Sequence, residues 1–177
     1  MFLDESGFLL IPNVRKTWAP LGKTPLLWHR YSHDRISAIS AVIVSHQRQR
    51  VGLYFHLYRD NITQDEVTLF LRYLLRQIKG QIVLLWDGGP IHTARKVRDF
   101  LTRHPRLHVE RFPPYAPELN PDERVWAHCK AVLANGRPDN LDELMAALVK
   151  VTKQARRRPD LLRSFLTGSA LPPFLRP

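Results

Sequence analysis

The chain has 177 residues, of which 44% are hydrophobic, and its formal net charge is +11. This length and composition are typical of one globular domain with its own core. No apolar run approaches the roughly 20 residues of a membrane-spanning helix, and the acidic N-terminus, MFLDES, excludes a secretory signal. Because Cys129 is the only cysteine, the sequence excludes an internal disulfide and a cysteine-based zinc site, and a reducing, cytoplasmic setting fits.

The excess of positive charge indicates a polyanionic partner, most often nucleic acid. It is concentrated in residues 150–177, where a single acid, Asp160, accompanies seven basic residues. These basic residues are Lys150, Lys153, Arg156, Arg157, Arg158, Arg163 and Arg176. The alternative interpretation is a solvated helix end, where cations also interact favourably with the helix dipole.

Three strands are expected before the first helix. Phe2 and Leu3 are expected to end a short strand, followed by a turn at Asp4 to Gly7, since Asp-x-Ser-Gly is good turn chemistry. Residues 35–45 and 51–58 are rich in β-branched and aromatic side chains and are joined by a polar turn, which predicts a hairpin.

Residues 9–33 contain several prolines and are expected to be irregular. Trp18 and Trp28 in this region are expected to cover the sheet. Neighbouring lysines and arginines leave the alternative that these rings stack on bases while the cations pair with phosphates.

The clearest helix is predicted over 63–79, where apolar residues recur at i, i+3, i+4 and i+7. Thr63 and Glu66 form a plausible capping box, and Gly80 follows the end of the helix. The pattern continues with a strand at 82–86, a helix at 93–103 and a strand at 107–112. This alternation predicts parallel crossover connections.

The strand over 82–86 consists of five apolar residues, which predicts that it is central in the sheet and buried on both faces. Asp87 follows it directly and is succeeded by Gly88-Gly89-Pro90. An acid at the C-terminal end of such a strand lies where open α/β sheets bind ligands. Alternatively, Asp87 only opens a turn.

The segment Asn120-Pro121-Asp122-Glu123 predicts the start of a helix. Asparagine is a favoured N-cap, proline suits the first helical position, and acids suit the first turn. Alternatively, Glu123 has only a structural role, as the partner of Asn120 in a capping box. A last long helix is predicted over 140–157.

Three acids, Asp4, Asp87 and Glu123, thus stand at the ends of predicted elements. If the first strand lies beside the strand 82–86, Asp4 and Asp87 are neighbours at one sheet edge. Crowded carboxylates repel each other, and a divalent cation removes that conflict. Two such ions about 4 Å apart can stabilise the attacking and leaving oxygens of a phosphoryl transfer. A basic chain with three convergent acids fits metal-dependent cleavage of nucleic acid.

Four motifs carry a family resemblance. They are FLDESGF at 2–8, TWAP at 17–20 with Gly22, LWDGGPIH at 85–92, and PPYAPELNPDERVW at 113–126, followed by Lys130. Through them the sequence resembles the catalytic domain of DDE transposases, in particular bacterial insertion-sequence transposases allied to the mariner superfamily. The match runs from Phe2 to about residue 165, and the spacing between Asp87 and Glu123 lies within the family's narrow range.

The resemblance implies an α/β, ribonuclease-H-like fold. Its mixed five-stranded sheet would combine an antiparallel hairpin with parallel crossovers and carry helices on both faces. Residues 1–170 would form the catalytic domain, with 171–177 as a loosely ordered tail. Asp4, Asp87 and Glu123 would be the catalytic, metal-binding triad, with two Mg²⁺ or Mn²⁺ ions. His92 and Asn120 would have supporting roles, with a structural hydrogen bond as the alternative for His92.

The implied activity is hydrolysis at transposon ends, followed by attack of the freed 3′-hydroxyl on target DNA. The implied partners are double-stranded DNA and a second copy of the chain, with no membrane, in a bacterial cytoplasm at the nucleoid. The basic stretch from Lys150 to Arg163 would contact phosphates without reading sequence.

Two departures from the family pattern stand out. Gly88 occupies a position where many relatives carry asparagine, and the family's N-terminal helix-turn-helix region has no counterpart in these residues. Binding specific to transposon ends is therefore not expected from this chain alone. Two alternatives remain open: an inactive, truncated remnant that binds DNA non-specifically, and another ribonuclease-H-like nuclease such as a junction resolvase or an RNA-strand hydrolase.

Overall fold

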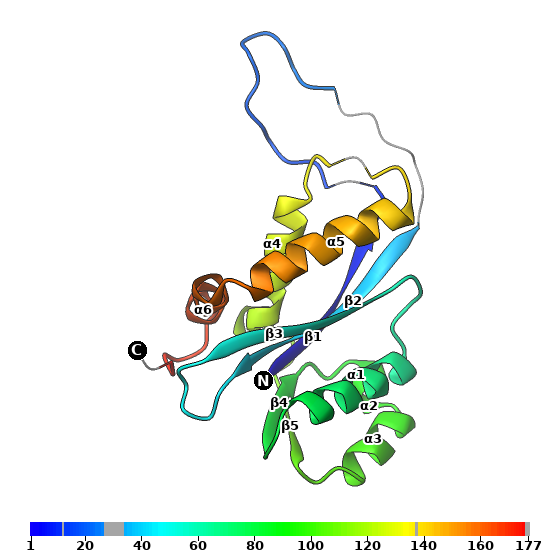
Figure 1. The fold of residues 1–177 in the computed structure, drawn as a ribbon, viewed down its shortest axis with the longest axis vertical. Coiled ribbons are helices and arrows are strands. Elements are labelled where there is room, and N and C mark those ends of the chain that lie inside the picture. The colour runs from blue at the N-terminus through cyan, green and yellow to red at the C-terminus, as the bar shows by residue number, and fades with distance from the viewer. Residues whose placement is uncertain (12, 27–33, 137, 176–177) are drawn as a thin grey trace.

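The computed structural model describes residues 1–11, 13–26, 34–136 and 138–175. They form a five-stranded sheet in the order β3-β2-β1-β4-β5, with helices on both faces (Figure 1). The strands are β1 Phe2–Leu9, β2 Arg35–Val44, β3 Val51–Tyr58, β4 Ile82–Trp86 and β5 Leu107–Arg111. The helices are α1 Gln64–Gln77, α2 Pro90–Thr93, α3 Arg95–Thr102, α4 Pro121–Val132, α5 Leu141–Arg156 and α6 Pro159–Gly168, with a short 3₁₀ helix, η1, at Pro117–Leu119.

The sheet is mixed, as predicted. Strands β1, β2 and β3 are antiparallel neighbours, whereas β4 pairs in parallel with both β1 and β5. The predicted hairpin and parallel crossovers are therefore confirmed. The described residues contain no helix that is both long and apolar enough to cross a bilayer.

Strand β1 corrects two expectations. It continues through the predicted turn to Leu9, so Asp4 lies inside a strand rather than at its end, paired with Ser40 of β2. Eight consecutive pairs with β2 satisfy this backbone, which overrides the local turn preference of Asp-x-Ser-Gly. Strand β1, not β4, is also the middle strand, and Val83 of β4 is 52% exposed, so β4 is not buried on both faces throughout.

Side chains of β1 alternate between two cores, as the period of a strand requires. Phe2 and Phe8 belong to the core under α4, α5 and α6, where the Phe8 ring meets Trp126 edge to face at 5.8 Å. Leu3 points the other way, into the core under α1 and α3 that also holds Trp86. Asp4 and its neighbour Glu5 therefore face opposite layers.

The helices agree with expectation at the start of α1 and differ from it in two other places. The capping box of α1 is confirmed, with both Thr63 and Glu66 in their predicted roles. The helix predicted over 93–103 begins at Arg95 as α3, and the short helix α2 before it was not predicted; Ala94 separates the two with an extended conformation (φ −60°, ψ 150°). Helix α6 was not predicted, although Leu162, Phe165 and Leu166 have helical spacing and are buried in it.

The predicted role of Trp18 is wrong. Its side chain is 100% exposed, on a segment that extends away from the sheet (Figure 1). Trp28 lies outside the described residues. The base of the segment is joined to the loop after α4, where the Arg15 amide donates to Asn135 Oδ1 (2.9 Å) and Asn135 Nδ2 donates to the Arg15 carbonyl (3.0 Å).

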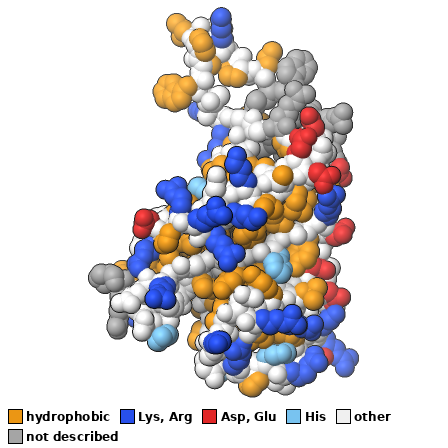
Figure 2. Space-filling model, viewed as in Figure 1, with side chains coloured by type: hydrophobic (Ala, Val, Ile, Leu, Met, Phe, Trp, Pro, Cys, Tyr) orange, Lys and Arg blue, Asp and Glu red, His pale blue; other side chains and the backbone are white. Residues whose placement is uncertain are grey.

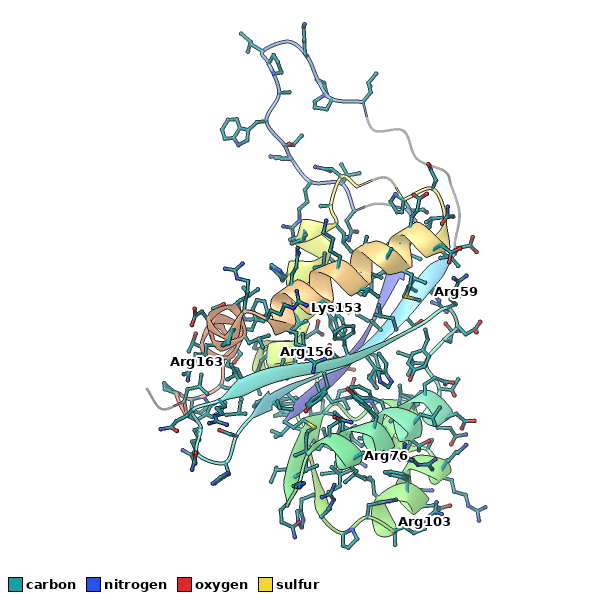
Figure 3. The ribbon with its side chains drawn as sticks, viewed as in Figure 1. Arg59, Arg76, Arg103, Lys153, Arg156 and Arg163 are labelled. Atoms are coloured by element: carbon teal, nitrogen blue, oxygen red, sulfur yellow. The ribbon has the colours of Figure 1, made fainter. Side chains whose placement is uncertain are left out.

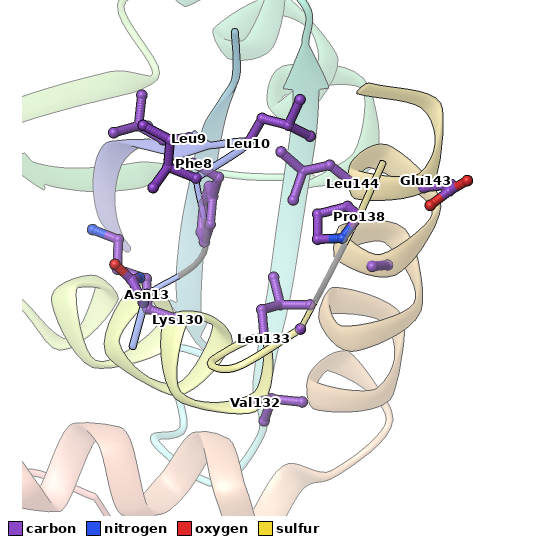
Figure 4. A pocket seen from close by; sticks show the side chains of 14 residues that line it. Phe8, Leu9, Leu10, Asn13, Lys130, Val132, Leu133, Pro138, Glu143 and Leu144 are labelled. Carbon is purple, nitrogen blue, oxygen red and sulfur yellow. The ribbon is translucent and has the colours of Figure 1, made fainter. Parts of the chain in front are cut away.

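A cavity of about 560 Å³ lies beside this junction (Figure 4). Phe8 and Leu10 line it from β1 and the residue after it, Leu133 lines it from the end of α4, and Leu144 lines it from α5. The projecting segment thus begins over an apolar hollow rather than over the face of the sheet.

Candidate active site

The sheet register brings the first two predicted acids side by side. Phe2 of β1 pairs with Leu85 of the parallel strand β4. Asp4 lies two residues further along β1, and Asp87, directly after the end of β4, lies two residues beyond Leu85, so the same register puts the two acids level with each other. The sequence expectation that these acids are neighbours depended on this adjacency of β1 and β4.

The third acid comes from the start of α4. The N-cap, Asn120, accepts a hydrogen bond from the Asp122 amide (3.1 Å) and donates one from Nδ2 to the Leu3 carbonyl (3.2 Å). The buried Asn120 therefore both starts the helix and ties it to β1, close to Asp4. The Asn120 backbone amide donates to the Pro117 carbonyl, so Glu123 is not its capping-box partner, and the exposed Glu123 side chain lines the cleft.

Asp4, Asp87 and Glu123 line one cleft of about 870 Å³. The rest of the lining comes from residues 88–90 after β4 and from the end of β5 and the loop between β5 and α4. Arg111 at the end of β5 contributes the cationic side chain of this lining, and Tyr115 contributes an aromatic one.

The electrostatics of Asp4 indicate a site that favours a counter-cation. Burial, reinforced by the negative charge of Glu123, Glu5 and Asp87, raises the pKa of Asp4 to about 8. Carboxylate oxygens are the donors that Mg²⁺ and Mn²⁺ prefer, so the donor chemistry fits these ions. In the described part of the chain, however, no group of three or more His, Cys, Asp or Glu side chains is arranged to hold a metal ion. The three acids line one cleft, but their side chains are not arranged as a complete set of metal ligands.

His92 from α2 is a buried polar group beside the three acids. Its ring is 3% exposed and stacks on Trp86, with centroids 4.2 Å apart. Nδ1 lies 2.6 Å from Asp87 Oδ1, and Nε2 lies 3.0 Å from Glu5 Oε1. Burial alone would lower the pKa of His92, but these two carboxylates outweigh it and raise the pKa to about 9.

Asp87 has a second fixed partner. The Gly89 amide donates to Asp87 Oδ1 at 2.8 Å, and a Cβ on residue 89 would lie only 2.9 Å from the same oxygen. A side chain at residue 89 would therefore require the Asp87 carboxylate to shift. The hydrogen bonds from His92 and Gly89 lower the pKa of Asp87, so its carboxylate is held in the ionised form.

The predicted DNA-contact residues do not form one patch. Lys150, Lys153, Arg156, Arg157 and Arg158 are all exposed. Figure 3 shows Lys153 and Arg156 on α5 facing the viewer, with Arg76 of α1 on the same side of the molecule. In Figure 2, lysine and arginine side chains gather on this face over α5 and over α1 and α3.

The other basic residues have different surroundings. The Arg156 guanidinium lies 5.6 Å from the centre of the Tyr54 ring, whereas Arg157 and Arg158 line a hollow with His128 of α4. The half-buried Arg163 donates a hydrogen bond to the Gln49 carbonyl in the β2–β3 turn. Arg176 lies outside the described residues.

Two residues of the site were missed by sequence reasoning. The signal for Glu5 was its place next to Asp4 in a strand, which sends its side chain to the opposite face. The signal for Tyr115 was the run Pro113-Pro114-Tyr115-Ala116-Pro117, which holds a bulky residue in a rigid loop. Tyr115 is 101% exposed and has a left-handed backbone (φ 58°), an uncommon conformation for an aromatic residue.

The fold is similar to that of known transposase structures. A pre-cleavage Mos1 transpososome has a TM-score of 0.63 and 18% identity over 96% of this chain and 56% of that chain. The Mos1 transposase paired-end complex with the left transposon end has a TM-score of 0.62 and 19% identity over 93% of this chain and 53% of that chain. The catalytic domain of Mos1 mariner transposase has a TM-score of 0.55 and 18% identity over 96% of this chain and 82% of that chain.

At these identities the likeness establishes the fold, which is ribonuclease-H-like, as predicted. The chain spans about half the length of the full Mos1 transposase chains it matches. No curated protein sequence matches it significantly. The sequence model of one family, described as DDE superfamily endonuclease, matches residues 1–145, which is most of the chain and includes Asp4, Asp87 and Glu123. The chain belongs to the DDE superfamily endonuclease family.

Proposed function

We propose that residues 1–170 are the catalytic domain of a transposase, which cuts DNA at transposon ends and joins the ends to target DNA. The observation that carries this proposal is the lining of one cleft by Asp4, Asp87 and Glu123, three acids from distant parts of a DDE-family chain. The similar Mos1 structures include paired-end complexes with Mn and with Mg, which supports divalent metal use here. The working partners would be transposon-end and target DNA and a second copy of the chain, at the nucleoid of a bacterial cytoplasm.

The three acids would hold two Mg²⁺ or Mn²⁺ ions. Such ions activate an attacking oxygen and stabilise the charge on the leaving oxygen in phosphoryl transfer. In the first reaction, water attacks a backbone phosphorus and the 3′-oxygen leaves as a hydroxyl. In the second, that 3′-hydroxyl attacks a phosphorus of the target strand, and the target's own 3′-oxygen leaves as a hydroxyl.

The chain's own residues would hold the three acids in place for these reactions. Asp87 is held by His92 and Gly89, and Asp4 is held in the middle of a five-stranded sheet. Glu123 is placed by the capped end of α4. Arg111 lines the cleft, where its cation would face the phosphate backbone of bound DNA.

Non-specific DNA contact would come from the exposed cations of α5. Lys150, Lys153 and Arg156 protrude from one helix and would interact with phosphates through charge alone. Figure 2 shows the wider basic surface to which Lys153 and Arg156 belong.

The direct test is nicking of supercoiled plasmid in the presence of Mn²⁺. The parent chain is compared with Asp87→Ala and Glu123→Ala, with folding checked by circular dichroism. We expect nicking by the parent and none by either variant. Activity that survives both substitutions would refute the assigned triad.

The alternative of an inactive remnant predicts a different result. A folded parent chain that binds DNA but nicks none, with Mn²⁺ or Mg²⁺, would favour it. Cleavage restricted to branched DNA or to the RNA strand of a hybrid would instead favour another ribonuclease-H-like nuclease.

A further inference from the structure

Glu5 is a half-buried acid that contacts the site without lining the cleft. It follows Asp4 in β1, so its side chain leaves the opposite face of the sheet. This face carries α1, α2 and α3, and there Glu5 Oε1 meets His92 Nε2 at 3.0 Å. The cleft that holds Asp4, Asp87 and Glu123 is not lined by Glu5. The described hydrogen bond that connects the Glu5 side chain to the site therefore runs through His92.

The described contacts hold the His92 ring at its face and at both of its nitrogens. Trp86 stacks on its face with an interplanar angle of 10°. Each ring nitrogen faces a different carboxylate, one from β1 and one from the residue after β4. A ring held in this way fixes the direction of the Nδ1–H bond toward Asp87.

The described hydrogen bonds of the Asp87 side chain, from His92 and from Gly89, both end on Oδ1. The side chain is 62% exposed, so Oδ2 remains accessible from the cleft. A carboxylate fixed through one oxygen presents the other in a defined direction. Such outer partners set the orientation and affinity of a metal ligand.

From this chain of contacts we infer that Glu5 is a positioning residue for the metal centre: through His92 it orients Asp87 so that one carboxylate oxygen faces the divalent cation. The inference rests on the proposed function, since it assigns a role toward the ions of that site. It adds a half-buried acid outside the triad to the groups that determine metal affinity.

The test measures Mn²⁺ affinity of the whole chain by electron paramagnetic resonance of free Mn²⁺, beside the melting temperature in EDTA. The variants are Glu5→Ala, Glu5→Gln and His92→Phe, together with the double variant Glu5→Ala/His92→Phe. His92→Phe keeps an aromatic ring against Trp86 but removes both ring nitrogens. Glu110→Ala, at an exposed acid of β5, is the matched control.

We expect Glu5→Ala to weaken Mn²⁺ binding by about 10-fold, as for other outer-shell partners of metal ligands. Glu5→Gln should recover part of the affinity, because its amide oxygen can still accept from Nε2. Glu110→Ala should leave the affinity unchanged. In the His92→Phe background, Glu5→Ala should cause no further loss, because the two residues act through one chain of contacts.

Two results would overturn the inference while leaving the triad intact. Unchanged Mn²⁺ affinity in Glu5→Ala would mean that Glu5 is only structural. An equal loss in the His92→Phe background would mean that Glu5 acts on the ion directly. Absence of Mn²⁺ binding by the parent, or binding that Asp87→Ala does not affect, would count against the proposed metal centre itself and would overturn the role of Glu5 with it.

Nitrogen chemical shifts of the His92 ring supply a readout that needs no metal. If Glu5 orients the ring, Glu5→Ala should change the signals of both ring nitrogens in the metal-free chain. Unchanged ring signals would contradict the contact on which the inference stands.

Discussion

Ser40 donates a hydrogen bond to Asp122 across 2.5 Å, and this bond connects the neighbour of one triad acid to the neighbour of another. Ser40 is the β2 residue paired with Asp4, and Asp122 directly precedes Glu123 in α4. Both side chains are fully buried. The bond therefore joins the sheet to the first turn of α4, beside the bond from Asn120 to β1.

Ser40→Ala should destabilise the chain and disturb the cleft. It leaves a buried carboxyl oxygen without its donor, which costs about 1–3 kcal/mol. Denaturant unfolding measures this loss. Ser37→Ala is the matched control, because Ser37 is also buried in β2 but faces the other layer. An equal loss in both variants would contradict a special role for the Ser40 bond.

Asp4→Asn should stabilise the metal-free chain at alkaline pH. The pKa of Asp4 in the folded chain, about 8, exceeds the ordinary value of 3.8, so ionisation at Asp4 opposes folding. The penalty is absent below pH 3.8, grows between pH 3.8 and 8, and is complete above that. We expect the melting temperature of the variant to exceed that of the parent by about 3–6 °C at pH 8.5, equivalent to roughly 1–2 kcal/mol, and by less at pH 5.

The control for this prediction is addition of Mn²⁺ to the parent. Bound cation offsets the carboxylate repulsion, so the stabilisation should be larger at pH 8.5 than at pH 5 and smaller in Asp4→Asn. A gain in melting temperature that is the same at both pH values would show that the charge of Asp4 is not its cause.

Asn120→Ala should affect both stability and nicking. It removes the cap bond from the Asp122 amide and the bond to the Leu3 carbonyl, with an expected loss of about 1–2 kcal/mol. Asn140→Ala is the comparison, since Asn140 caps α5 at an exposed position away from the cleft. We expect similar losses of stability but reduced plasmid nicking only in Asn120→Ala. Equal nicking by both would remove Asn120 from the site.

Charge reversal at Lys153 and Arg156 should weaken DNA binding and flatten its salt dependence. Each lost phosphate contact reduces the slope of log K against log salt by about 0.9. Fluorescence anisotropy with duplex DNA over a range of NaCl concentrations measures this slope. Reversal of Arg157 and Arg158, which line the hollow beside His128, should have a smaller effect. A slope unchanged by the first pair would exclude this face of α5.

The parts of the fold that depend on local pattern were predictable. Strand β4 begins and ends where its apolar run does, and the cap of α1 has both predicted partners. The length of β1 was not predictable in this way. Its polar residues between Leu3 and Phe8 read as a turn, and only pairing with β2 makes them a strand.

The site residues also divide into those that a local sequence pattern predicts and those that only contacts between distant segments reveal. Asp4, Asp87 and Glu123 could be named from spacing and family resemblance, because the motifs are local. The contact of Glu5 with His92 joins residues from β1 and α2 across the sheet, and no local pattern encodes a partner so distant in sequence. The prediction for Trp18 was wrong for a related reason. A ring covers a sheet only if its segment packs against that sheet, and the residues around Trp18 in the sequence do not show that its segment extends away from it.

The projecting segment over 13–26 belongs to the connection between β1 and β2, and therefore between Asp4 and the other two acids of the proposed metal centre. It exposes Lys16 and Lys23 to proteases such as trypsin, while β1 is bound by β2 on one side and β4 on the other. A backbone cut there would leave β1 as a separate peptide clamped between two strands, with Asp4 on one fragment and the other two acids on the second. We therefore expect the proposed metal centre to depend on strand pairing rather than on an unbroken chain, so that two fragments mixed in solution should reconstitute it.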